Sequence, residues 1–197
     1  ILSGLVGSEM CIRDRGPVEG MVVMEELGRG IVLEPLNQAL IAGAMLSYYA
    51  GQDLQEAWCA KVASGEALVV LAAQERKARY DLSVCNTVAQ QQGNGWTLSG
   101  AKSVVPAGDL ADAFIVPAKA DGKLALFLVE RTANGVTTHG YLTQDGSSGA
   151  ELKLSATPAT LLTLKGQEAL EHATDIGIAA LCAEAVGVMD KTLAITV

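Results

Sequence analysis

The chain has 197 residues, of which 50% are hydrophobic, 18% charged and 4% aromatic, and it contains 21 glycines. High apolar content with modest charge is typical of a globular protein and excludes a disordered tail, a collagen and a coiled coil. The 14 basic and 22 acidic residues give a net charge of −8. Because phosphate backbones are bound by clustered Lys and Arg, and no basic stripe is present, we expect no nucleic-acid partner.

The first 16 residues read ILSGLVGSEMCIRDRG. Their short apolar part is followed by charged residues, without the small-residue cleavage site that closes a signal peptide. The stretch GLVGSEMCIRDR resembles translated sequencing-adaptor sequence. We therefore interpret residues 1–16 as a non-native segment and leave them out of the predicted fold.

Helical spacing of apolar residues predicts three helices in residues 17–66. The first runs from Pro17, which suits a first helical turn, to Gly28 or Gly30. The second runs from about residue 35 to about residue 50. The third is capped by Asp53 and ends at Gly65. We interpret this region as the end of a helical domain.

After Gly65 the pattern changes to short apolar or β-branched runs separated by turn residues, at a spacing of about 10 residues that is typical of sandwiches and barrels. The clearest hairpin signal is the turn QQGNG, followed by WTLSGAKSVVPAG, which we interpret as two short strands meeting at Ser99 and Gly100. We expect an antiparallel β-barrel or sandwich over residues 67–165. Its other predicted strands cover residues 67–73, 82–89, 113–118, 124–129 and 136–139.

The helical period returns at Gln167 and continues to Val197 without a capping residue. We expect one group of residues to lie broadly on one side of this helix, and a second group of small residues to let a neighbouring helix approach closely. The first group is Leu170, Ala173, Gly177, Leu181, Val188 and Leu193, and the second is Ala179, Ala180, Ala183 and Gly187. Residues 166–197 are therefore predicted to open a second helical domain, cut short at Val197, and the fold class is α+β.

The spacing of the cysteines and histidines predicts no metal site, and the longest apolar stretch predicts no membrane span. The four cysteines, Cys11, Cys59, Cys85 and Cys182, lie far apart, and neither they nor the two histidines have the short spacings of a zinc site. We interpret the thiols as buried and reduced, in a cytoplasmic protein. Residues 31–50 contain polar residues and a proline, which favours a buried helix over a membrane span.

Common catalytic motifs are absent from the sequence. The stretch GNGWTLSG has a leucine where the dinucleotide fingerprint requires its last glycine, and no P-loop occurs. The GSSG stretch at 146–149 is not a nucleophile elbow and predicts a flexible loop. Paired carboxylates at 25–26 and 168–171 are typical of a solvated helix surface. Motif chemistry alone therefore assigns no reaction.

Four segments, in this order, resemble the acyl-CoA dehydrogenases. They are EELGRG at 25–30, ALVVLAAQERKARYDLS at 67–83, GWTLSGAKSVVPAGDLADAFIVPA at 95–118 and AEAVG at 183–187. The resemblance covers about residues 17–197 and implies an N-terminal helical domain, a middle β-barrel and a C-terminal four-helix bundle, of which residues 166–197 would be the first helix. It also implies FAD as cofactor, because in this family a glutamate takes the Cα proton of an acyl-CoA while flavin N5 accepts a hydride from Cβ.

The resemblance carries individual roles onto positions of this sequence. Cofactor contacts fall on Ala73, Gln74 and Glu75, which match a TEP-type segment beside the flavin pyrimidine, and on Val104, Val105 and Pro106, which match a WIT-type segment beside N5. Tyr80 matches a position that binds the cofactor or the thioester ligand, and Asp175 matches a position that contacts the adenine end of CoA. Ala73, Val104 and Val105 are alternatively barrel core, and Asp175 is alternatively a solvated helix residue.

Departures from the family pattern are concentrated at these positions. Gln74 replaces a threonine, Val104 replaces the aromatic residue that covers the flavin, and Pro106 lacks both a hydroxyl and a backbone donor. Arg76 replaces a proline and Ile178 an arginine. Some members carry the catalytic base where this chain has Gly177, and the more usual base lies beyond residue 197, so no catalytic residue is assigned.

The resemblance implies a flavin-dependent acyl-CoA dehydrogenase that passes electrons to an electron-transfer flavoprotein or similar acceptor and forms homo- or hetero-oligomers. The departures leave a second hypothesis open, a degenerate subunit that supports an active dehydrogenase partner, and a flavin oxidase on the same fold is a third. The sequence does not separate steroid from fatty acyl substrates. Because flavin in this family is also held by the bundle and a neighbouring subunit, we expect residues 1–197 alone to be inactive and, with uncovered apolar surface, to aggregate.

Overall fold

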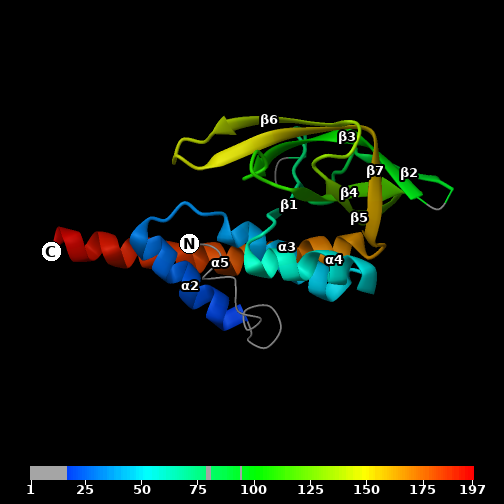
Figure 1. Cartoon of the computed structure of the whole chain (residues 1–197). Coiled ribbons are helices and arrows are strands. Elements are labelled where there is room, and N and C mark those ends of the chain that lie inside the picture. The colour runs from blue at the N-terminus through cyan, green and yellow to red at the C-terminus, as the bar shows by residue number, and fades with distance from the viewer. Residues whose placement is uncertain (1–16, 79–80, 94) are drawn as a thin grey trace.

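The computed structural model describes residues 17–78, 81–93 and 95–197, and it consists of a β-barrel stacked on a layer of helices (Figure 1). Three helices precede the barrel: α2 (Pro17–Gly30), α3 (Leu36–Tyr49) and α4 (Gln52–Ser64). One long helix, α5 (Gly166–Thr196), follows it. The expected α+β class with a middle barrel is confirmed, whereas the proposed non-native segment 1–16 lies outside the described residues.

The barrel closes because the two strands at the ends of its hydrogen-bonded order also pair with each other. Strands β4, β2, β3, β7 and β5 follow one another around the ring, and β5 pairs back onto β4. β1 pairs with the start of β4 and β6 with the first half of β7. The strand bounds are β1 (Val69–Leu71), β2 (Val88–Gln92), β3 (Gly95–Pro106), β4 (Ala113–Ala120), β5 (Lys123–Glu130), β6 (Val136–Leu142) and β7 (Ser148–Thr163).

Two details correct the predicted sheet. β1 and β2 both pair with β4 in parallel, so the sheet is mixed and not purely antiparallel. The predicted break at Ser99 and Gly100 is instead a register shift within one continuous strand, β3, between Leu98 and Gly100. A glycine is needed there for close approach, because a Cβ on Gly100 would lie 2.5 Å from Thr87 Oγ1.

Other element bounds also differ from the predictions. α4 is capped by Gly51, and Asp53 lies in its first turn, while Gly65 ends it in the left-handed conformation, with φ 73°, as predicted. The segment predicted as a strand over residues 82–89 becomes β2 only at Val88, and the expected strand over 67–73 shortens to β1. β7 was not predicted, and part of the GSSG stretch that was expected as a loop belongs to it.

Two apolar layers hold the barrel together and fix it to the helices. Inside the barrel, Phe114 and Phe127 pack with apolar side chains of β3 and β7. On its outer face, Ile115 and Leu126 pack against Met45 of α3 and the first turns of α5. β4 and β5 are therefore buried on both faces, which explains their continuous apolar sequences.

The contact between α2 and α5 depends on small residues. A Cβ on Gly28 would lie 2.0 Å from the Glu184 carbonyl oxygen, and one on Gly187 would lie 1.8 Å from that of Glu25. Ala180 and Ala183 are also buried, as expected for a close helix contact. Of the six residues expected on one side of this helix, Leu170, Ala173 and Gly177 are buried. Leu181, Val188 and Leu193 are exposed, because the buried face follows the small residues there.

Two further expectations concern the burial of the thiols and the presence of a membrane-spanning helix. Cys85 is buried, but Cys59 is partly buried and Cys182 is exposed, so the prediction of buried thiols holds only for Cys85 within the described residues, and Cys11 lies outside them. None of the helices that the structure describes is both long and apolar enough to cross a membrane.

Candidate functional site

The structure brings together the two segments on which the sequence analysis placed cofactor contacts. The first, Ala73–Glu75, follows β1, and the second, Val104–Pro106, ends β3. Their neighbouring backbones are joined directly, since the Ser103 amide donates a hydrogen bond of 2.9 Å to the Gln74 carbonyl oxygen. Thirty residues apart in sequence, Gln74 and Val104 thus lie on adjoining backbone segments.

A buried ion pair lies directly beside this backbone contact. Lys102 Nζ is 2.8 Å from Glu75 Oε1, and the two residues are only 1% and 5% exposed. Charges so far from water persist only when they are paired and hydrogen-bonded. Each partner adjoins one end of the Ser103–Gln74 bond, so the ion pair and the backbone bond join the same two segments.

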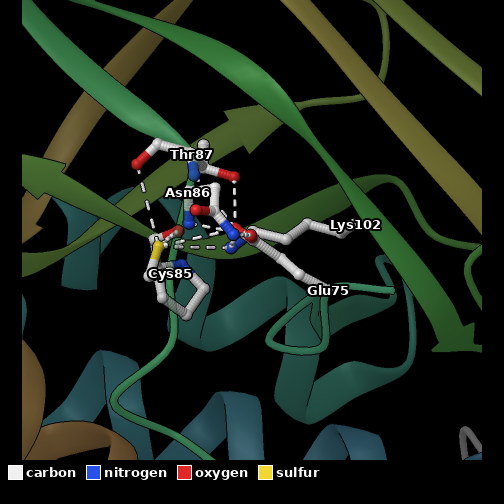
Figure 2. Close-up of polar contacts among 6 residues, drawn as sticks. Glu75, Cys85, Asn86, Thr87 and Lys102 are labelled. Carbon is white, nitrogen blue, oxygen red and sulfur yellow. Dashed lines mark hydrogen bonds and ion pairs between the residues drawn. The ribbon is translucent and has the colours of Figure 1, made fainter. Parts of the chain in front are cut away.

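The Glu75 carboxylate is saturated by a third segment, the loop that leads into β2 (Figure 2). Oε1 accepts hydrogen bonds from the Thr87 amide at 3.0 Å and the Thr87 hydroxyl at 2.8 Å. Oε2 accepts from the Asn86 amide at 2.7 Å and its side-chain nitrogen at 3.0 Å. Burial alone would raise the pKa of Glu75, but Lys102 and these donors outweigh burial and lower it to about 2.

Cys85 completes the cluster without being an activated nucleophile. Its thiol has two acceptors within hydrogen-bond distance, Glu75 Oε1 at 3.5 Å and the Pro117 carbonyl oxygen at 3.4 Å, and Lys102 Nζ lies 3.7 Å from the sulfur. Burial raises the pKa of the thiol despite the nearby ammonium. A reactive cysteine needs the thiolate, so this thiol acts as a packing and hydrogen-bonding group.

Val104 is the strained residue of the site. It lies in a second register shift of β3, between Lys102 and Val105, and adopts φ 51°, a left-handed conformation that is unfavourable for a β-branched side chain. Its side chain is 48% exposed, whereas that of Val105 packs in the barrel core. Such strain in an exposed apolar residue is typical of positions that contact a ligand.

The backbone beside Val104 offers hydrogen-bond donors that suit a heteroaromatic cofactor. Among the residues that the structure describes, none accepts a hydrogen bond from the amide of Gln74 or Glu75. Amides of this kind fit the carbonyl oxygens of a flavin pyrimidine, and an exposed aliphatic side chain fits a ring face. In the second segment, Pro106 supplies neither an amide hydrogen nor a hydroxyl. The donors that suit the cofactor are therefore those of the first segment, at Gln74 and Glu75.

The remaining predicted positions lie elsewhere. Tyr80 is outside the described residues, and Asp175 is exposed on α5. Gly177 is buried on the same helix, where a Cβ would lie 3.2 Å from Ile41 Cδ1, so there is little room for a carboxylate side chain. In the described part of the chain no group of three or more His, Cys, Asp or Glu residues is placed to hold a metal ion.

The partners of Glu75 were not predicted from the sequence. Lys102, Asn86 and Thr87 carry no recognised motif, and Glu75 was considered only for its position in the TEP-type segment. One signal could have identified the lysine: Leu98 and Lys102 have the same parity in a strand, which predicts that both side chains point to the same buried face.

Comparisons with known proteins find relatives of similar sequence and similar fold. Residues 70–156 match the family model described as acyl-CoA dehydrogenase, middle domain. Acyl-CoA dehydrogenase FadE27 of Mycobacterium tuberculosis is 28% identical over 141 residues, which cover 71% of this chain and 36% of that protein. The mitochondrial short-chain specific acyl-CoA dehydrogenase of Homo sapiens is 28% identical over 125 residues, which cover 59% of this chain and 30% of that protein.

Solved structures match nearly the whole chain. A chain of the steroid ACAD Tcur3481-Tcur3483, G363A variant, has a TM-score of 0.84 and 29% identity, over 99% of this chain and 52% of its own. Glutaryl-coenzyme A dehydrogenase in its glutaryl-CoA complex has a TM-score of 0.86 and 24% identity, over 95% of this chain and 51% of its own. This chain thus spans about half the length of these structures and about a third of the curated relatives. By its sequence matches and its barrel-and-helix fold, the chain contains a middle domain of the acyl-CoA dehydrogenase type.

Proposed function

We propose that the protein carrying this chain is a flavin-dependent acyl-CoA dehydrogenase, which removes one hydrogen each from Cα and Cβ of an acyl-CoA thioester. The observation that carries this proposal is the junction of Gln74 and Ser103. It juxtaposes backbone donors that have no acceptor within the described part of the chain with the exposed, strained Val104, on a barrel that matches acyl-CoA dehydrogenases. FAD, when bound there, would supply the hydride acceptor.

In this proposal the described residues position and shield the reacting groups. The amides of Gln74 and Glu75 donate to the cofactor, Val104 contacts its ring, and the packed barrel interior excludes water from that side. The proton-abstracting base is not assigned, because Gly177 occupies one family position for it. Electrons would pass to an electron-transfer flavoprotein or a similar acceptor.

The proposal is tested by the flavin content and turnover of the purified protein that carries this chain. We expect a yellow protein with one FAD per subunit that reduces an artificial electron acceptor when given an acyl-CoA. Relatives named for short-chain, very long-chain and steroid dehydrogenases define the substrate panel. Absence of flavin, or no acceptor reduction with any thioester, would refute the proposal.

The substitutions at Gln74, Val104 and Pro106 favour a second candidate, a degenerate subunit in a hetero-oligomer. Two matched structures are named as pairs of different proteins, Tcur3481-Tcur3483 and ChsE4-ChsE5. Expression with its neighbouring genes separates the candidates: co-purification of a second dehydrogenase subunit that holds all the flavin would support the degenerate subunit, and a flavin-loaded homo-oligomer would exclude it.

A further inference from the structure

We propose that Lys102 is a positioning residue for the flavin: its buried ion pair with Glu75 holds the Ser103–Val104 backbone against Gln74 in the conformation that the cofactor contacts. This inference rests on the proposed function. Lys102 and Glu75 would not touch the cofactor themselves, because each side chain is buried and directed at the other.

The cluster connects segments that are far apart in the sequence. The ion pair and the hydrogen bonds to Glu75 join three separate segments: the one after β1, the one before β2, and β3. No strand ladder joins the first of these segments to β3 at this point, since β3 pairs with β2 and β7. Apolar packing of Ala72 and Val105 in the barrel core also joins these two segments. The cluster and the Ser103–Gln74 bond add the polar contacts that fix Gln74 and Ser103 against each other.

The backbone strain at Val104 must be maintained by its neighbours. A valine with φ 51° relaxes to an extended conformation unless its neighbours prevent it. Lys102 precedes this residue by two positions and is anchored by its ammonium, while Val105 follows it and is anchored in the barrel core. Val104 is thus held between two fixed points, and only the Lys102 anchor depends on a pair of charges.

Positioning of the two segments by the cluster differs from a simple contribution to the stability of the barrel. Many core substitutions would destabilise the barrel, whereas loss of this cluster is expected to act locally, by freeing residues 73–76 and 103–106 relative to each other. Leu162 gives a matched comparison, because it is 4% exposed and packs in the apolar layer between barrel and helices, in a different cluster from the barrel-interior residue Val105.

The experiment compares Lys102→Met and Leu162→Ala with the unaltered protein that carries this chain, below the melting temperature of every variant. FAD affinity is measured by flavin fluorescence, and backbone hydrogen exchange of residues 73–78 and 100–107 is measured in the flavin-free protein. We expect Lys102→Met to weaken FAD binding by about tenfold or more, which corresponds to the loss of about one hydrogen bond to the cofactor. It should also accelerate exchange in both segments, whereas Leu162→Ala should leave both readouts near those of the unaltered protein.

Thr87→Val keeps the test informative if Lys102→Met does not fold. It removes one hydroxyl donor to Glu75 and retains the ion pair. We expect it to accelerate exchange in the same two segments and to weaken FAD binding less than Lys102→Met does. Unchanged exchange and FAD affinity in the folded variants would overturn the positioning role. If the unaltered protein binds no FAD, the proposed function fails, and the exchange measurement still decides whether the cluster fixes the two segments.

Discussion

At the scale of single residues, the Glu75–Lys102 pair is the most consequential interaction of the described chain. Both charges are buried, and Glu75 accepts hydrogen bonds from Thr87 and Asn86 as well as from Lys102. Taking such a pair out of water costs several kcal/mol per ion, so its value lies less in net stability than in the geometry it fixes.

Removing one partner of this pair is expected to destabilise the protein strongly. Lys102→Met leaves the Glu75 carboxylate buried without its cation, which should lower the free energy of unfolding by about 3–5 kcal/mol. Urea unfolding of the protein that carries this chain measures the change. Lys165→Met is the matched control, because Lys165 pairs with Glu168 at 3.7 Å on the surface, where ion pairs contribute little. Equal effects of the two substitutions would contradict the account.

The lowered pKa of Glu75 predicts a specific dependence of stability on pH. Its folded-state pKa, about 2, lies below its ordinary value of 4.5, so the carboxylate stabilises the fold above pH 4.5 and this contribution is lost as the pH falls toward 2. Glu75→Gln removes the titrating group. The difference in unfolding free energy between the unaltered protein and this variant should therefore narrow between about pH 6 and about pH 3. A difference that stays constant over this range would show that Glu75 is not the titrating group.

At the scale of elements, the pairing of α2 with α5 depends on glycines that a side chain cannot replace. The Cβ of Gly28→Ala would lie 2.0 Å from a carbonyl oxygen of the facing helix, and backbone cannot move aside cheaply. The helices must separate, at a cost of about 1–3 kcal/mol. Gly20→Ala on the same helix is the control: its Cβ would make an ordinary 3.6 Å contact with Leu40. Chemical denaturation of both variants should show a loss only for Gly28→Ala, and a similar loss for both would refute the close packing.

Elements could be predicted from sequence where local pattern and tertiary packing agree. Turn residues 121–122 and 134–135 bound β5, and its continuous apolar run reports burial on both faces. β7 could not be predicted so readily, because Ser155 and Pro158 interrupt its alternation and Ala156 has a positive φ, 48°. The alternating buried residues Ala150, Leu152 and Leu154 are the signal that was available.

At the scale of the whole molecule, the resemblance to acyl-CoA dehydrogenases supplied what local patterns could not. It selected Gln74 and Val104 as neighbours of a common ligand, and the structure joins their segments through the Ser103–Gln74 bond. It did not indicate that Lys102 and Thr87 saturate Glu75, because such contacts arise only when three distant segments meet. The docking of the helices on the barrel's outer face likewise follows from tertiary packing, whereas the helices themselves follow from local apolar spacing.

The central claim, that this barrel serves a flavin-dependent acyl-CoA dehydrogenase, is tested most directly by an anaerobic single turnover. The purified, flavin-loaded protein is mixed with one equivalent of acyl-CoA, the flavin absorbance is followed, and the thioester is analysed by mass spectrometry. The account predicts loss of the flavin's visible absorbance together with loss of two hydrogens from the acyl chain, in equal amounts. An oxidised flavin and an unchanged thioester, with every member of the substrate panel, would contradict it.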